Sequence, residues 1–210
     1  MSKLFVAGIG PGSADFVTPA AKKAVKTAEI TMGSERALDL FPEANEIIIL
    51  NVKDVQEKLE LAVDLVKKER SVCVLSTGDP GFSGVLKPIQ RIIAEKGIEI
   101  DLEVIPGISS LQLCAARAEL PWDSADLMTF HGREDFSEIL KILDNGRPTI
   151  TLPSRSTKDM AQFLLDNGIN PSRKVTVCER MSYPDEKMVT GTLKEIAKSE
   201  FTYMCVMIIY

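Results

Sequence analysis

The chain has 210 residues, of which 45% are hydrophobic and 26% charged, and its formal net charge is −5. This length allows one large or two small domains, and the composition is that of an ordinary folded protein. The negative balance argues against a nucleic-acid partner, and no apolar run reaches the roughly 20 residues that span a bilayer.

The start of the chain indicates a cytoplasmic protein, and the cysteines are predicted to be reduced. The apolar stretch at residues 4–9 is too short for a signal-peptide core, and Gly10-Pro11-Gly12 ends it. The four cysteines contain no C-x-x-C pair, and three of them lie in apolar, β-branched runs. We therefore expect reduced, buried thiols rather than a disulfide or a metal site. The single histidine excludes a His-rich metal site, and no metal ion is expected.

Short apolar runs alternate with longer stretches of helical period, which is typical of an α/β protein. In the first half we expect strands at residues 4–7, 30–32, 46–50, 71–75 and 102–105. Helices are expected at residues 19–28, 55–68 and 85–95, with a short one after the second strand. The first of these helices has Thr18 as its N-cap and Pro19 at its first position.

The second half is predicted to contain more strand. A helix at residues 109–118 is followed by residues 119–123, which break the pattern and are the expected hinge. Beyond the hinge, Ser156 and Asp159 resemble a capping box that starts another helix. The expected strands are 127–130, 149–152, 175–178, 187–190 and 203–209, and the other helices are 136–143 and 193–198. We therefore predict an α/β domain at residues 1–120 and a more mixed α/β domain at residues 121–210.

The first glycine-rich turn, residues 8–13, joins a strand to a helix, as a dinucleotide-binding fingerprint would. That fingerprint needs a glycine where Ser13 stands and a free amide where Pro11 stands. A nucleotide-binding oxidoreductase is therefore disfavoured. Glycine also serves wherever the backbone needs a positive φ angle, so this turn alone fits a structural role equally well.

Two further loops follow expected strands, and ligands of open α/β sheets bind at the carboxyl ends of strands. In one, Gly78 and Gly81 permit a close backbone approach and Asp79 can accept hydrogen bonds, although a plain Asp-Pro-Gly turn is the alternative. The other, residues 106–110, offers two hydroxyl groups and free amides at a helix start, which suits a carboxylate or a ribose. A serine cap is the alternative there. Three such loops in one half of the chain favour a ligand site.

In this order and spacing, the three loops resemble the G-x-G-P-G, G-D-P-x-x-x-G and P-G-I-S/T-S/A signature of the tetrapyrrole (corrin/porphyrin) methylase family. Within that family, further segments resemble the branch that methylates C5 of cobalt-precorrin-7 in cobalamin biosynthesis. These segments are Gly81-Phe82, Ser109-Ser110-Leu111-Gln112-Leu113, Ala116-Arg117, Leu120-Pro121-Trp122, His131-Gly132-Arg133, Glu179-Arg180-Met181, Glu186 and Gly191-Thr192.

The resemblance implies two α/β domains of the tetrapyrrole methylase type, with the active site in the inter-domain cleft, and a homodimer. It also implies S-adenosylmethionine, bound in a folded conformation, as the methyl donor and S-adenosylhomocysteine as a product. The donor ligands expected by position are Pro11, Thr77, Gly78, Asp79, Phe82, Ser109, Ser110, Pro153 and Met181.

The resemblance also implies which residues contact the tetrapyrrole. Gly10 and Gly12 are expected beside it, and arginines suit its carboxylates because a guanidinium pairs in a bidentate way. The candidate arginines are Arg36, Arg117, Arg133 and Arg180. Many relatives carry an aspartate directly after Gly-Pro-Gly, whereas here Ser13-Ala14-Asp15 follows, so the role of Asp15 is open.

Alignment of donor and acceptor is the expected main task of such an enzyme, so a strong general base is not required. Glu35 and His131 are the candidates for proton movement. A solvated carboxylate at a helix start and a structural histidine are their alternatives.

Three other functions stay open from the sequence. A tetrapyrrole methylase that acts at another ring position or in siroheme formation is one. A nucleotide-binding oxidoreductase and a ligand-binding protein without activity are the others. The expected partners are a cobalt-corrin substrate and, because some relatives carry a fused domain beyond the position of Tyr210, a separate enzyme that methylates C15 and decarboxylates a side chain.

Overall fold

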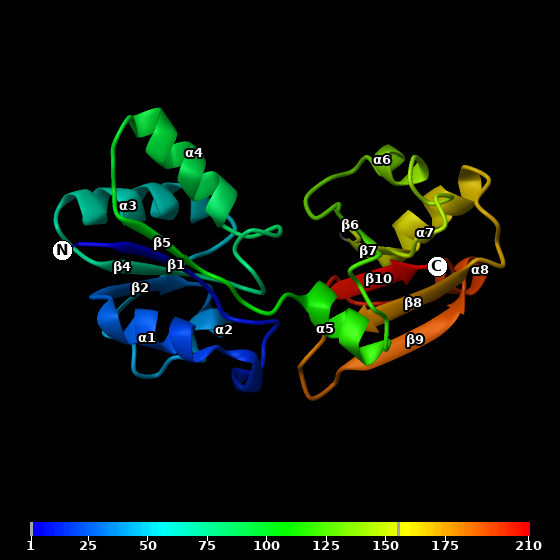
Figure 1. Cartoon of the computed structure of the whole chain (residues 1–210), viewed down its shortest axis with the longest axis horizontal. Helices are drawn as coiled ribbons and strands as arrows, with labels where there is room; N and C mark the ends of the chain where they lie inside the picture. The colour runs from blue at the N-terminus through cyan, green and yellow to red at the C-terminus, as the bar shows by residue number, and fades with distance from the viewer. Residues whose placement is uncertain (1, 155) are drawn as a thin grey trace. The chain divides into compact units, whose positions relative to one another are not determined.

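The computed structural model describes residues 2–154 and 156–210, and it contains two compact units, Met1–Ser109 and Ser110–Tyr210. Each unit is built on a five-stranded sheet with helices packed on its faces (Figure 1). The predicted α/β class is therefore confirmed. Within the described part of the chain, no helix has the length and apolar character needed to cross a membrane.

The sheet of the first unit is entirely parallel and has the strand order β3-β2-β4-β1-β5. Its strands are β1 (Leu4–Gly8), β2 (Ile30–Gly33), β3 (Glu46–Ile49), β4 (Val72–Ser76) and β5 (Leu102–Ile105). Its helices are α1 (Pro19–Thr27), α2 (Glu35–Leu38), α3 (Val55–Lys67) and α4 (Leu86–Lys96), with a 3-10 turn at Ala14–Phe16. All the strands and helices expected in this half are present.

Both faces of this sheet are covered, as is typical of parallel sheets. Side chains alternate between the two faces of a strand, so Leu4 and Val6 of β1 pack with α3 and α4 while Phe5 and Ala7 pack with α1 and α2 (Figure 1). The first helix begins as predicted, because Thr18 Oγ1 accepts a hydrogen bond from the Ala21 N–H at 3.1 Å. Because helices cover both faces of this sheet, the loops at the ends of its strands remain available to bind a ligand.

The sheet of the second unit is mixed, with the order β6-β7-β10-β8-β9; β6 pairs with β7 in parallel and the other pairs are antiparallel. Its strands are β6 (Asp126–Thr129), β7 (Thr149–Leu152), β8 (Lys174–Glu179), β9 (Lys187–Thr192) and β10 (Cys205–Ile209). Its helices are α5 (Ser110–Arg117), α6 (Ser137–Leu140), α7 (Thr157–Asp166) and α8 (Leu193–Ile196). The sequence places α5 before the domain boundary, but α5 packs on β7 and β10.

One expectation about the cysteines is wrong. Cys114 of α5 and Cys178 of β8 form a disulfide, with 6.0 Å between their Cα atoms. The bond arises because α5 packs on the face of the sheet toward which Cys178 points, a contact between residues 64 apart that local patterns do not reveal. Cys73 and Cys205 are buried free thiols, as expected. Burial raises the pKa of the Cys73 thiol to about 12.

Candidate active site

The loops that follow β4, β1 and β5 meet at the carboxyl ends of these neighbouring strands. The Gly78 N–H donates to the Gly10 carbonyl at 2.8 Å, and the Gly10 N–H donates to the Gly78 carbonyl at 3.4 Å. A Cβ added to Gly8 would lie 2.5 Å from the Gly107 nitrogen and 2.7 Å from the Gly78 oxygen. Only residues without a side chain let the three backbones approach this closely.

Asp79 braces this glycine junction, which we define as Gly8, Gly10, Gly78 and Gly107. Its Oδ1 accepts from the Gly81 N–H at 2.8 Å and its Oδ2 accepts from the Gly107 N–H at 3.1 Å. The carboxylate thereby joins the loop after β4 to the loop after β5. A carboxylate offers about four acceptor positions, so this half-buried side chain can also receive a ligand hydrogen bond.

The donor residues expected in the first unit lie in these loops. Pro11 is buried directly after Gly10, and Thr77 is exposed directly after β4. The Phe82 N–H donates to the Asp79 carbonyl at 3.3 Å. Ser109 is next to Gly78, since a Cβ on that glycine would lie 3.6 Å from the Ser109 Cα. The remaining expected donor residues, Ser110, Pro153 and Met181, belong to the second unit.

Pro153 and Met181 follow β7 and β8, which lie on either side of β10 and are both antiparallel to it. The two residues therefore lie at the same end of this sheet, and both are buried. Met181 is held in an unusual turn, because its neighbours Arg180 and Ser182 have φ angles of 49° and 70°. Residues other than glycine rarely adopt this left-handed conformation, and it is concentrated at functional sites.

The candidate arginines of the second unit pair with carboxylates of their own unit. Arg117 Nε lies 2.8 Å from Glu186 Oε1, Arg133 Nη1 lies 2.8 Å from Glu138 Oε2, and Arg180 Nε lies 2.6 Å from Asp185 Oδ2. The fourth, Arg36, is an exposed residue of α2 in the first unit. A substrate carboxylate would have to bind an arginine that is already paired, or displace the carboxylate that pairs with it. The sequence alone does not indicate these ion pairs.

The two candidates for proton movement are exposed. Glu35 is the first residue of α2, and its exposed position also fits a solvated carboxylate at a helix start. His131 follows β6, and its backbone N–H donates to Thr129 Oγ1 at 3.3 Å. No group of three or more metal-binding side chains is found in residues 2–154 and 156–210.

Two features of the site could not be assigned from the sequence. The first and third glycine loops are distant in the chain, whereas Gly8 and Gly107 are in contact. Glu186 is indicated only by the family resemblance, whereas its carboxylate accepts hydrogen bonds from both Arg117 and Ser182. The crowding of glycines after three strands was the signal for the first feature. The second has no local sequence signal.

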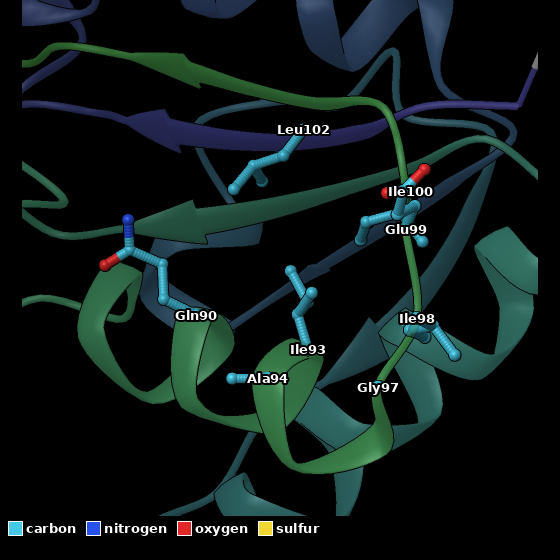
Figure 2. Close-up of a pocket in the computed structure, with 8 residues that line it drawn as sticks. All are labelled: Gln90, Ile93, Ala94, Gly97, Ile98, Glu99, Ile100 and Leu102. Carbon is cyan, nitrogen blue, oxygen red and sulfur yellow. The ribbon is translucent and has the colours of Figure 1, made fainter.

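A surface depression of about 700 Å³ lies away from these loops, at the amino end of β5 (Figure 2). It is lined by residues of α4, of the following turn and of β5, namely Gln90, Ile93, Ala94, Gly97, Ile98, Glu99, Ile100 and Leu102. None of the predicted site residues is among them, so this depression is not the candidate active site.

Comparisons with known proteins identify the family of the chain. The family model described as Tetrapyrrole (Corrin/Porphyrin) Methylases matches residues 3–197. A Methanocaldococcus jannaschii protein named probable cobalt-precorrin-7 C(5)-methyltransferase is 39% identical over 97% of this chain and 95% of its own length. From the same organism, a cobalt-precorrin-4 C(11)-methyltransferase is 29% identical over 93% of this chain and 81% of its own length.

A solved structure shares the fold. The uroporphyrin-III C-methyltransferase of Thermus thermophilus, complexed with S-adenyl homocysteine, matches 99% of this chain and 97% of its own with a TM-score of 0.80 at 22% identity. The chain thus belongs to the tetrapyrrole (corrin/porphyrin) methylase family, whose members are S-adenosylmethionine-dependent methyltransferases.

Proposed function

We propose that this chain transfers a methyl group from S-adenosylmethionine to C5 of cobalt-precorrin-7, giving cobalt-precorrin-8 in cobalamin biosynthesis. The observation that carries the proposal is the 39% identity, along almost the whole chain, to a relative with that name. Identity to the relative that acts at C11 is lower, at 29%. A methylase for another ring position is therefore the less supported alternative, and a nucleotide-binding oxidoreductase is not favoured.

The glycine junction fits a methyl donor. Amide N–H groups and the hydroxyl groups of Thr77, Ser109 and Ser110 suit a ribose and a carboxylate, while Asp79 can accept from an ammonium group. The side chains of Pro11, Phe82, Pro153 and Met181 offer apolar surface for a purine ring. With Gly78, these are the proposed donor ligands.

When bound, the donor supplies an electrophilic methyl group on a sulfonium. The residues of this chain then have to orient the donor and the acceptor carbon and to exclude water. The glycine junction suits orientation, because its backbone is fixed by the paired bonds of Gly10 with Gly78 and by the brace of Asp79. Glu35 or His131 would move a proton only where the acceptor requires it.

Several finer points belong to the proposal. Gly10 and Gly12 would lie beside the tetrapyrrole, with Arg36, Arg117, Arg133 and Arg180 as partners of its carboxylates. A homodimer and a separate enzyme for C15 methylation and decarboxylation are supported by the family resemblance and stay predictions. A cytoplasmic location also stays a prediction.

Incubation with cobalt-precorrin-7 and S-adenosylmethionine carrying a ¹³C-methyl group tests the reaction, with NMR of the product as the readout. Label at C5 is expected; label at another carbon would instead support the alternative ring position. Titration calorimetry separates the enzyme classes, since S-adenosylhomocysteine should bind and NADH should not.

Substitution of Asp79 by alanine tests the donor site. The variant loses the brace between two loops, so its Kd for S-adenosylhomocysteine should rise about tenfold, the effect of losing one hydrogen bond to a charged group. Asp39→Ala, which changes an exposed aspartate at the end of α2, is the matched control and should bind like the wild type. Equal affinities for the two variants would remove Asp79 from the donor site.

A further inference from the structure

The carboxylate of Glu186 joins a helix end to a tight turn. Its Oε1 accepts from Arg117 Nε at 2.8 Å, and its Oε2 accepts from the Ser182 N–H at 2.7 Å. Its own N–H donates to the Tyr183 carbonyl at 2.9 Å, and its side chain is 21% exposed. A single side chain therefore fixes two segments that are distant in the sequence.

One of these segments is the turn that carries Met181. The left-handed conformations of Arg180 and Ser182 need outside support, and the bond from the Ser182 N–H to Glu186 supplies it on one side of Met181. On the other side, the Arg180 N–H donates to the Met204 carbonyl at 2.9 Å. Without the carboxylate, the backbone at Ser182 can relax and move Met181, which is 3% exposed in the folded protein.

The other segment is the last turn of α5, which ends at Arg117. Glu186 contacts the Nε of this guanidinium, so the pair leaves the two Nη nitrogens, which together can bind a further carboxylate in a bidentate way. A second tie joins the same segments. The disulfide connects Cys114, three residues before Arg117, to Cys178, three residues before Met181. The helix end and the Met181 turn are thus fixed relative to each other at two points.

The charge of Glu186 is also maintained. Partial burial pushes the pKa of its carboxyl upward, but the hydrogen bonds from Arg117 and Ser182 and the charge of Arg117 outweigh this effect, so the pKa lies below its usual value. Glu138 differs, since it pairs with Arg133 on an open surface where both side chains are more than half exposed. Exposed pairs of that kind contribute little.

We propose that Glu186 is a positioning residue that sets Met181 for the methyl donor and Arg117 for a carboxylate of the tetrapyrrole. The proposal rests on the proposed function, since it assumes that Met181 and Arg117 bind these two ligands. It predicts that the two contacts are coupled through one side chain, and that different substitutions of Glu186 separate them.

Two substitutions and one control test this. Glu186→Gln keeps an oxygen that can accept from Ser182 but loses the ion pair with Arg117. The KM for cobalt-precorrin-7 should therefore rise about tenfold, while the Kd for S-adenosylhomocysteine stays within about twofold. Glu186→Ala loses both bonds, and both constants should rise about tenfold. The control Glu200→Gln, which changes an exposed carboxylate paired with Lys158, should change neither constant.

A role through Arg117 has a further consequence. If Glu186 acts on the substrate by orienting that guanidinium, then adding Glu186→Gln to Arg117→Ala should raise KM no further. Fully additive effects on KM would overturn the proposal, as would wild-type constants in a folded Glu186→Ala variant. Should that variant not fold, Glu186→Asp, which is one methylene too short to reach both donors, is expected to raise both constants, and wild-type constants in it would overturn the proposal.

Failure of the proposed function gives a different result. If the wild type binds S-adenosylhomocysteine but forms no C5-methylated product, the ring position is wrong. The affinities of the Glu186 variants for S-adenosylhomocysteine then still decide the part of the proposal that concerns Met181.

Discussion

The glycine junction makes a sharp prediction for Gly107→Ala. The added Cβ would overlap the Gly78 carbonyl oxygen and would lie 2.7 Å from the Gly8 Cα. Both neighbours are backbone atoms, so no flexible side chain can move aside. The nearest Gly8 atom would be its carbonyl carbon at 2.6 Å, so to reach the 3.4 Å of an ordinary contact the loop must move by about 0.8 Å, and clearing the Gly78 oxygen requires more.

This movement has two costs. Overpacking of a fixed site typically costs about 1–3 kcal/mol. The same shift also stretches the 3.1 Å bond from the Gly107 N–H to Asp79 beyond hydrogen-bond range. We expect the free energy of unfolding to fall by about 3 kcal/mol in total. Because a misplacement near 1 Å can lower a rate about 100-fold, kcat/KM should fall by about that factor.

Urea unfolding followed by circular dichroism measures the first effect, and titration with S-adenosylhomocysteine followed by methyl-transfer kinetics measures the second. Gly81→Ala is the matched control in the same region. Its Cβ would meet only the side-chain Oδ1 of Asp79, at 3.2 Å. If Gly107→Ala were as stable as Gly81→Ala and equally active, the three loops would not meet as described.

Three further predictions concern the second unit and the thiols. Intact-mass measurement after alkylation in urea should count two modified cysteines without reductant, the free Cys73 and Cys205, and four with it. Dithiothreitol should lower the free energy of unfolding by up to about 4 kcal/mol, the chain-entropy value for a bridge between residues 64 apart. A Cys114→Ala/Cys178→Ala variant should show no such response in urea titrations. The folded pKa of Glu186 lies below its usual 4.5, so its stabilisation is present above pH 4.5 and is lost as the pH falls through the folded value. The difference in free energy of unfolding between the wild type and Glu186→Gln should therefore shrink as the pH falls below 4.5.

The elements of the first unit could be predicted because their signals are local. Residues 72–75 form a continuous apolar run, as a strand buried on both faces requires, and the structure places β4 at Val72–Ser76. Thr18 and Pro19 mark the start of α1, and the structure shows the predicted cap. Signals were weaker in the second unit, where the helix expected at residues 136–143 is reduced to Ser137–Leu140.

Features that depend on contacts between distant residues could not be predicted. The disulfide forms only because α5 packs on the sheet that contains Cys178, and the sequence shows nothing of that packing. Likewise, nothing near Arg180 or Ser182 indicates their left-handed conformations, because neither is a glycine or an asparagine. These conformations are maintained by tertiary contacts such as the bond to Glu186.

The same distinction explains why the glycine loops could be related directly to a ligand site, whereas the contacts to the tetrapyrrole could be inferred only from the family resemblance. The glycine junction is made of backbone, so its requirement appears directly as glycines at fixed positions after three strands. The candidate contacts to the tetrapyrrole are side chains, and their geometry depends on carboxylate partners such as Glu186. A substitution in such a pair can redirect an arginine without disturbing the glycine loops. Specificity for one carbon of the ring should accordingly follow from these pairs rather than from the donor loops.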